Sequence, residues 1–80
     1  MPVIHRERGF RFFFYSNEGE PREPAHVHIR AGRDEAKFWL RPEVRLAYND
    51  GFGASTLRDL MRVVEKRRSS FESAWDDYFR

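Results

Sequence analysis

The sequence predicts a single α+β domain over residues 1–80, with a curved antiparallel sheet of four or five strands covered on one face by one or two C-terminal helices. Before residue 50, short β-branched and aromatic runs are separated by turn residues, which is typical of a meander of strands. After Ala54, apolar residues recur at the spacing of a helix. Strands followed by helices indicate the α+β class, and 80 residues suffice for one domain.

The first two strands are predicted at residues 3–7 and 10–16, with Gly9 in the turn between them. The second run, F-R-F-F-F-Y-S, is the clearest strand of the chain because aromatic residues dominate it. Side chains in a strand alternate between two faces. One face of this run holds Phe10, Phe12 and Phe14, and the other holds Arg11, Phe13 and Tyr15. Aromatic residues on both faces favour a central strand that is covered on both sides.

The third strand carries two of the three histidines of the chain. Its sequence, H-V-H-I-R-A at residues 26–31, follows an acidic loop with two prolines at residues 17–24. The simplest topology for the two strands that this loop joins is an antiparallel hairpin. By the same alternation, we expect one apolar face that enters the core and one polar face that a ligand can reach. The polar face holds His26, His28 and Arg30, and the apolar face holds Val27 and Ile29.

Two further strands complete the predicted sheet. Residues 35–40 alternate apolar side chains with polar or amphipathic ones, and residues 44–48 form a last short strand after Pro42. We expect the apolar residues of that last strand to share one face, namely Val44, Leu46 and Tyr48. The sequence N-D-G at residues 49–51 marks the turn that follows.

The last third of the chain is predicted to be helical. Its apolar residues recur every three or four positions: Leu57, Leu60, Met61, Val64, Phe71, Trp75 and Tyr78. Thr56 with Asp59, and Ser69 with Glu72, have the spacing of a capping box, which predicts two helices. One continuous bent helix is the alternative. Either arrangement lays an apolar stripe on the sheet and buries Phe12, Phe14, Val27, Ile29 and Phe38.

Composition excludes several classes of protein. Without cysteine, the chain forms no disulfide and no cysteine-based zinc site, and we expect it to be cytoplasmic. No apolar run approaches the ~20 residues of a membrane span. The net charge of +2 is mildly basic, but nearly all basic residues are arginine, which suits bidentate contact with phosphate or carboxylate; a GC-rich genome is the alternative reason. Aromatic residues make up 16% of the chain, so we expect a homodimer that hides part of this surface.

The polar face of the third strand is the candidate site. Two imidazoles, His26 and His28, can divide the general acid and general base roles of a metal-independent ribonuclease. Arg30 would stabilise the charge that builds on the phosphate. Tyr15 and Lys37 are the expected helpers from neighbouring strands. This chemistry needs no cofactor.

Three alternatives stay open for His26 and His28. A His-x-His pair on a strand can bind a divalent transition metal, with a third ligand from one of four residues: Glu18, Glu20, Glu23 or His5. H-V-H-I-R also resembles part of the motif of the histidine-triad hydrolases, although Arg30 stands where a third histidine is needed. Finally, the imidazoles can simply cover a half-exposed face, stack on Phe13 and Trp39, and bond to the preceding loop.

Two surfaces are candidates for nucleic-acid contact, a basic stripe on the first helix and a basic–aromatic pair beside the histidines. They comprise Arg58, Arg62 and Lys66, and Lys37 and Trp39. The stripe can contact phosphates, and the indole of Trp39 can stack on a base. Alternatively, Asp59 and Glu65 balance the stripe on a solvated helix face, and Trp39 lies buried under the loop.

Motifs along most of the chain resemble those of one family. In order, they are F-F-F-Y-S-N-E-G, P-x-H-V-H, E-A-K-F-W-L-x-P-x-V-R-L-A, G-F and E-x-A-W-x-x-Y-F. Between residues 2 and 79 the chain thus resembles the short prokaryotic proteins of domain-of-unknown-function family 4160. The family hallmark maps to Pro24, His26, Val27 and His28, and Ala25 departs from it by replacing a second proline.

The resemblance implies one member of a toxin–antitoxin-like gene pair, with the product of a neighbouring gene as its partner. Combined with the candidate site, it predicts a protein that engages RNA or DNA, as a ribonuclease toxin that uses His26 and His28. The alternative is a non-catalytic antitoxin or transcriptional regulator that binds operator DNA or a partner protein.

Overall fold

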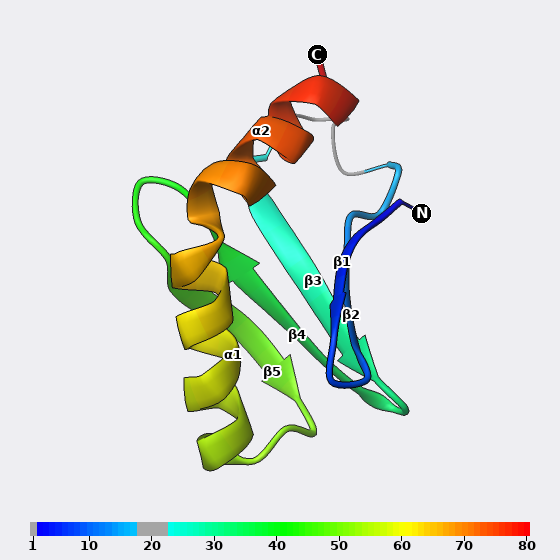
Figure 1. Ribbon diagram of the computed structural model, residues 1–80, viewed down its shortest axis with the longest axis vertical. Helices are drawn as coiled ribbons and strands as arrows, with labels where there is room; N and C mark the ends of the chain where they lie inside the picture. Colours follow the sequence, from blue (N-terminus) through cyan, green and yellow to red (C-terminus); the bar gives the residue numbers. More distant parts are fainter. Residues whose placement is uncertain (1, 18–22) are drawn as a thin grey trace.

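The computed structural model describes residues 2–17 and 23–80, which form one antiparallel sheet and two helices. The elements are β1 (Val3–Glu7), β2 (Phe10–Phe13), β3 (His26–Ala31), β4 (Asp34–Trp39), β5 (Arg45–Asp50), α1 (Ala54–Lys66) and α2 (Arg68–Tyr78). The strands lie in chain order and each neighbouring pair is antiparallel. Both helices lie on one side of the sheet (Figure 1), so the predicted α+β fold is confirmed. No helix within these residues is long and apolar enough to span a membrane.

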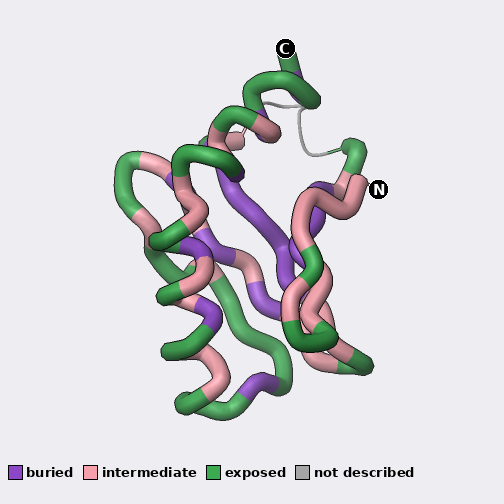
Figure 2. The backbone as a smooth tube through the Cα atoms, viewed as in Figure 1, coloured by how far each residue is buried: buried purple, intermediate pink, exposed green. Residues whose placement is uncertain are grey.

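The core fills the space between the sheet and the helices. The five side chains that we expected there are at most 1% exposed: Phe12, Phe14, Val27, Ile29 and Phe38. Trp75 of α2, 2% exposed, closes one end, with its ring 5.3 Å from that of Phe14 and 4.2 Å from that of Phe79. The longest buried stretch of backbone is the central strand β3 (Figure 2). Each large apolar side chain buried in this way stabilises the fold by ~1.5–3 kcal/mol.

Strand β2 is shorter than predicted, because it ends at Phe13 and not at Ser16. Phe13 pairs with Val3, the first residue of β1. One more hydrogen bond follows, from the backbone N–H of Phe14 to the carbonyl of Pro2 at 3.2 Å. The ladder between β1 and β2 ends here because Phe13 already pairs with the first residue of β1.

Strand β5 is irregular at Ala47. Lys37 of β4 pairs with Tyr48, but the next residue of β4, Phe38, pairs with Leu46, so β5 carries one extra residue at this point. Such a bulge reverses the alternation of side chains beyond it. Leu46 therefore faces the helix side, where it lines a groove with Phe38, whereas Tyr48 faces the opposite side. The prediction that Leu46 and Tyr48 share a face was wrong.

Neither helix uses the predicted capping box. The N-cap of α1 is Gly53 and that of α2 is Arg67, and no side-chain hydrogen bond caps either helix start. The connection before α1 gives the reason. Asn49 donates from Nδ2 to the carbonyl of Phe52 at 2.8 Å, and its Oδ1 accepts from the Phe52 N–H at 3.1 Å. Because Phe52 is also buried, the chain is anchored there and enters the helix before the predicted cap.

The turn after β5 should tolerate no side chain at Gly51. Gly51 has a φ of +111°, and a Cβ there would overlap the carboxylate of Asp34. We expect Gly51→Ala to lower the free energy of unfolding by ~1–3 kcal/mol in urea titrations. Gly32→Ala is the control, because Gly32 also has a positive φ, +61°, but has nothing within 4 Å of its Cβ position. An equal loss in both variants would show that the contact with Asp34 contributes nothing.

Candidate functional site

One face of the sheet, which lies opposite the helices except at the start of β3, carries polar and aromatic side chains, and we call it the polar face. Strand register places its members: His28 pairs with Phe13 on one side and Lys37 on the other, and Arg30 pairs with Glu35. By register and alternation, the polar face comprises Val3, Arg6, Arg11, Phe13, His26, His28, Arg30, Glu35, Lys37, Trp39, Arg45, Tyr48 and Asp50. The two histidines and the arginine of β3 thus lie on one face, as the alternation predicts.

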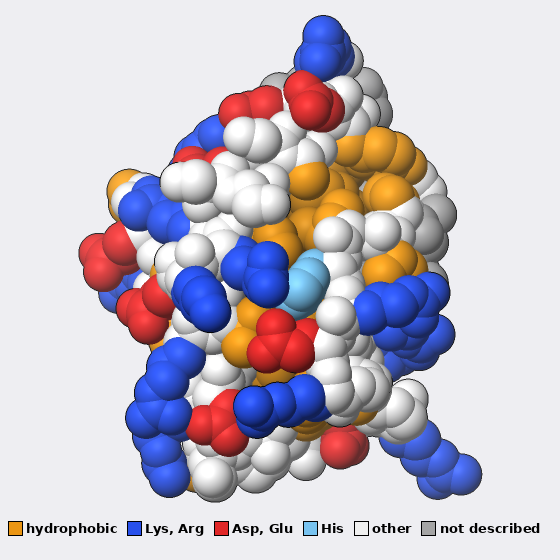
Figure 3. Space-filling view, in the orientation of Figure 1, with side chains coloured by type: hydrophobic (Ala, Val, Ile, Leu, Met, Phe, Trp, Pro, Cys, Tyr) orange, Lys and Arg blue, Asp and Glu red, His pale blue; other side chains and the backbone are white. Residues whose placement is uncertain are grey.

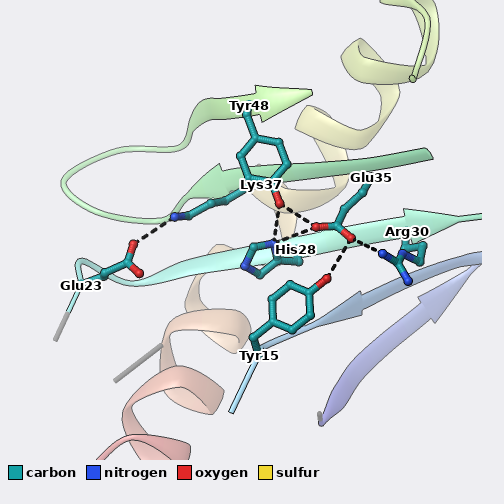
Figure 4. Close-up of polar contacts among 7 residues, drawn as sticks. All are labelled: Tyr15, Glu23, His28, Arg30, Glu35, Lys37 and Tyr48. Atoms are coloured by element: carbon teal, nitrogen blue, oxygen red, sulfur yellow. Dashed lines mark hydrogen bonds and ion pairs between the residues drawn. The ribbon is translucent and has the colours of Figure 1, made fainter. Parts of the chain in front are cut away.

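At the centre of the polar face, the carboxylate of Glu35 on β4 collects donors from β3, from β5 and from the residues just after β2. Its Oε1 accepts hydrogen bonds from Tyr15 Oη at 2.9 Å and from Arg30 Nη2 at 2.7 Å, and its Oε2 accepts one from Tyr48 Oη at 2.6 Å (Figure 4). His28 Nδ1 lies 3.5 Å from the same Oε2. We call these five residues the Glu35 cluster. They converge on one carboxylate from sequence positions up to 33 residues apart, counting from Tyr15 to Tyr48.

The environment of Glu35 keeps its carboxylate ionised. The side chain is 12% exposed, and burial alone would raise its pKa. The hydrogen bonds from Tyr48, Tyr15 and Arg30, with the charge of Arg30, outweigh that effect, so the pKa of Glu35 lies below its ordinary value. At neutral pH the cluster therefore contains a carboxylate acceptor beside an imidazole.

His28 is held in one orientation by aromatic neighbours. Its ring stacks on Phe13 at 5.6 Å and 23°, and meets the edge of the Tyr15 ring at 4.5 Å. Tyr48 Oη lies 3.3 Å from Nδ1. Because Tyr48 donates its single proton to Glu35, its oxygen can accept from Nδ1–H of His28. The residue is 3% exposed, so His28 is buried and the expectation that a ligand reaches its ring directly is wrong for this arrangement of side chains. Tyr48, which contacts it from the edge strand β5, is 41% exposed.

Lys37 and Trp39 extend the polar face beside His28. The ammonium of Lys37 lies 4.3 Å from the centroid of the Trp39 ring and donates to Glu23 Oε1 at 3.0 Å. Figure 4 shows the bond between Lys37 and Glu23, and Lys37 pairs with His28 across β3 and β4. The structure therefore brings the predicted helper and the predicted stacking residue together, at the end of the face where residue 23 leads into β3.

His26 is not accessible, and the expectation of an exposed ring at this position is wrong. Its ring is 5.2 Å from that of His28, but the residue is 0% exposed. Trp75 of α2 covers it at 4.6 Å, Trp39 meets it edge-on at 5.5 Å, and its Nδ1 lies 2.9 Å from the carbonyl oxygen of Pro24. These contacts match the structural alternative for His26 in part, because the ring contacts Trp39 and the preceding loop. The face is not half-exposed there, since helix α2 reaches over the start of β3 and seals the ring.

The metal alternative gains no third ligand from the residues that the structure describes. Within residues 2–17 and 23–80, no group of three histidine, cysteine, aspartate or glutamate side chains is arranged to hold an ion. Glu23 is engaged by Lys37, and His5 lies 3.0 Å from Glu7 and 6.0 Å from the ring of Phe71, on the helix side. The other two proposed ligands, Glu18 and Glu20, lie outside the described residues.

The basic stripe of α1 lies apart from the Glu35 cluster. Arg58, Arg62 and Lys66 are all exposed, and Arg62 pairs with Asp59 at 2.9 Å on the surface. Figure 3 shows acidic side chains mixed with the basic ones on the side of the molecule where α1 lies. Such exposed pairs contribute little to stability, and they match the alternative of a balanced, solvated helix face.

Sequence reasoning missed Glu35 and Tyr48. The contact of Glu35 with Arg30 could have been predicted, because the two-residue turn at positions 32–33 places residue 35 opposite Arg30 by hairpin register. The position of Tyr48 could not have been predicted, because only the bulge in β5 turns its ring toward His28.

Comparison with known proteins identifies the family of the chain. Searches of the curated proteins and of the solved structures found no match. A family model, described as Domain of unknown function (DUF4160), matches residues 9–76, which include every strand from β2 onward and the whole Glu35 cluster. The match covers far more than half of the sequence, so this chain belongs to the DUF4160 family.

Proposed function

We propose that the protein binds single-stranded RNA on the polar face of its sheet. The observation that supports this proposal best is the gathering of cations and aromatic rings on that face. The cations are Arg6, Arg11, Arg30, Lys37 and Arg45, and the nearby carboxylates are Glu23, Glu35 and Asp50. Glu23 and Glu35 are already paired with Lys37 and Arg30. The remaining positive charge favours a polyanion.

Aromatic side chains on the same face favour a single strand over a duplex. Tyr48 is 41% exposed, and Trp39 is half-buried with Lys37 over its ring. Unpaired bases stack on such rings, and each stacked base contributes ~1–3 kcal/mol to binding. Bases within a duplex have no free face to offer, so sheet surfaces of this kind suit single strands. The resemblance of the chain supports a place in a toxin–antitoxin-like gene pair, in which RNA is one natural target.

Charge reversal tests which surface binds RNA. Fluorescence anisotropy would follow a fluorescein-labelled, mixed-sequence RNA 12-mer. We expect Arg11→Glu with Arg45→Glu, on the polar face, to weaken binding at least about tenfold, because phosphate contacts dominate such affinities. The matched control, Arg58→Glu with Arg62→Glu on α1, changes the net charge by the same amount.

We expect the control to weaken binding by less than about threefold, through long-range charge alone. Equal losses in the two double variants would contradict the proposal. A loss only in the α1 variant would favour the other reading, in which a regulator binds nucleic acid through its basic helix.

A further inference from the structure

We propose that the Glu35 cluster also cleaves the bound RNA, with Glu35 as general base and His28 as general acid. This inference rests on the proposed RNA binding. It differs from a paired-histidine mechanism, because His26 is 0% exposed and a carboxylate takes its place beside His28. Transfer of an RNA phosphodiester to its own 2′-hydroxyl requires a general base and a general acid, and a carboxylate acceptor next to an imidazole donor can supply both.

The position of Tyr48 shows where a substrate hydroxyl can bind. Its Oη lies 2.6 Å from Glu35 Oε2 and 3.3 Å from His28 Nδ1, so one hydroxyl group already bridges the two catalytic candidates. Tyr48 belongs to the edge strand β5 and is 41% exposed, so rotation of its side chain would uncover both groups. A ribose 2′-hydroxyl in the place of the Tyr48 hydroxyl would have the general base, the Glu35 carboxylate, within hydrogen-bond distance.

Two other groups of the cluster are placed to stabilise the negative charge on the phosphate and to protonate the leaving group. Arg30 Nη2 is 2.7 Å from the Glu35 carboxylate and 41% of its side chain is exposed, so its guanidinium can also contact a phosphate beside the base. The second ring nitrogen of His28, Nε2, points away from Glu35 (Figure 4). Glu35 and Nε2 therefore lie on opposite sides of the imidazole ring, which separates the base from the acid as an in-line displacement needs.

The proposed step is a transesterification that balances without a co-reactant. Glu35 takes the proton of the 2′-hydroxyl, and the 2′-oxygen forms a bond to phosphorus. The bond from phosphorus to the 5′-oxygen of the next nucleotide breaks, and that oxygen takes a proton from the His28 imidazolium. The products are a 2′,3′-cyclic phosphate and a 5′-hydroxyl, and Arg30 compensates the charge that builds on the phosphate oxygens.

The chemistry of the products provides the test. The wild-type protein, incubated with the labelled 12-mer in EDTA, should produce fragments that end in 2′,3′-cyclic phosphate, as seen by denaturing gel and mass spectrometry. The all-2′-deoxy 12-mer lacks the nucleophile, so it should stay intact. If the RNA is bound but no cyclic phosphate forms, the cleavage proposal is overturned and the binding proposal stands. If the RNA is not bound at all, both fail.

Substitutions at Glu35 and His28 test the catalytic role proposed for each residue. Glu35→Gln and His28→Asn should each slow cleavage by about a hundredfold or more, with the affinity for the 12-mer within about twofold of the parent. The matched controls, Glu43→Gln and His5→Asn, lie outside the cluster and should keep the parental rate. Parental rates in Glu35→Gln and His28→Asn would overturn the assignment. If those variants do not fold, the comparison of the RNA 12-mer with the all-2′-deoxy 12-mer, made with the wild-type protein, still decides whether the protein cleaves RNA.

Discussion

Replacement of Trp75 by alanine is expected to lower the free energy of unfolding by ~3–5 kcal/mol, because it leaves a cavity the size of an indole. Trp75 is 2% exposed and packs against Phe14, His26 and Phe79 with ring centroids 4.2–5.3 Å away. A domain of this size has only ~5–15 kcal/mol in total. Urea denaturation followed by circular dichroism should therefore show a partly or fully unfolded variant.

The control for Trp75 lies one turn further along the same helix. Tyr78 is 43% exposed, so Tyr78→Ala should cost no more than ~1 kcal/mol. Similar losses in the two variants would contradict the role of Trp75 as the residue that closes the core. Because Trp75 also covers His26, its loss should expose the start of β3 and disturb the neighbouring ring of His28.

Glu35→Ala is expected to lower the free energy of unfolding by ~2–4 kcal/mol, because hydrogen bonds to an ionised group are strong and their donors lose their acceptor together. The donors are Tyr15, Arg30 and Tyr48. Glu43→Ala, in the exposed connection between β4 and β5, is the control and should change stability by no more than ~0.5 kcal/mol. A loss in Glu35→Ala as small as that of the control would show that the cluster does not stabilise the fold.

The pH dependence of stability separates the charge of Glu35 from its packing. The pKa of Glu35 is lower in the folded protein than its ordinary value of 4.5, because hydrogen bonds from Tyr48, Tyr15 and Arg30 outweigh burial. The stability that follows from this shift is fully present above the ordinary value and is lost as the pH falls through the folded value. Glu35→Gln removes it, so its free energy of unfolding should fall less than that of the parent between about pH 5 and 3. Identical slopes would contradict the depressed pKa.

Local patterns in the sequence were enough for most of the fold. The alternation along H-V-H-I-R placed His28 and Arg30 on one side of β3 and Val27 and Ile29 in the core. Helical spacing marked both helices and identified Trp75 as an apolar position. These features depend on the period of side chains along a strand or a helix, which is a property of each segment by itself.

Contacts between distant segments decided the site. The indole of Trp75 buries His26, and that contact joins residues 49 positions apart along the chain. The bulge at Ala47 turns Tyr48 toward His28 and Glu35, which regular alternation would have prevented. A periodic pattern carries no information about which helix will cover a strand or where one strand gains a residue against its neighbour. The sequence by itself therefore determined which side chains share a face of β3, and only tertiary packing decided which of them is sealed and which is joined to a carboxylate.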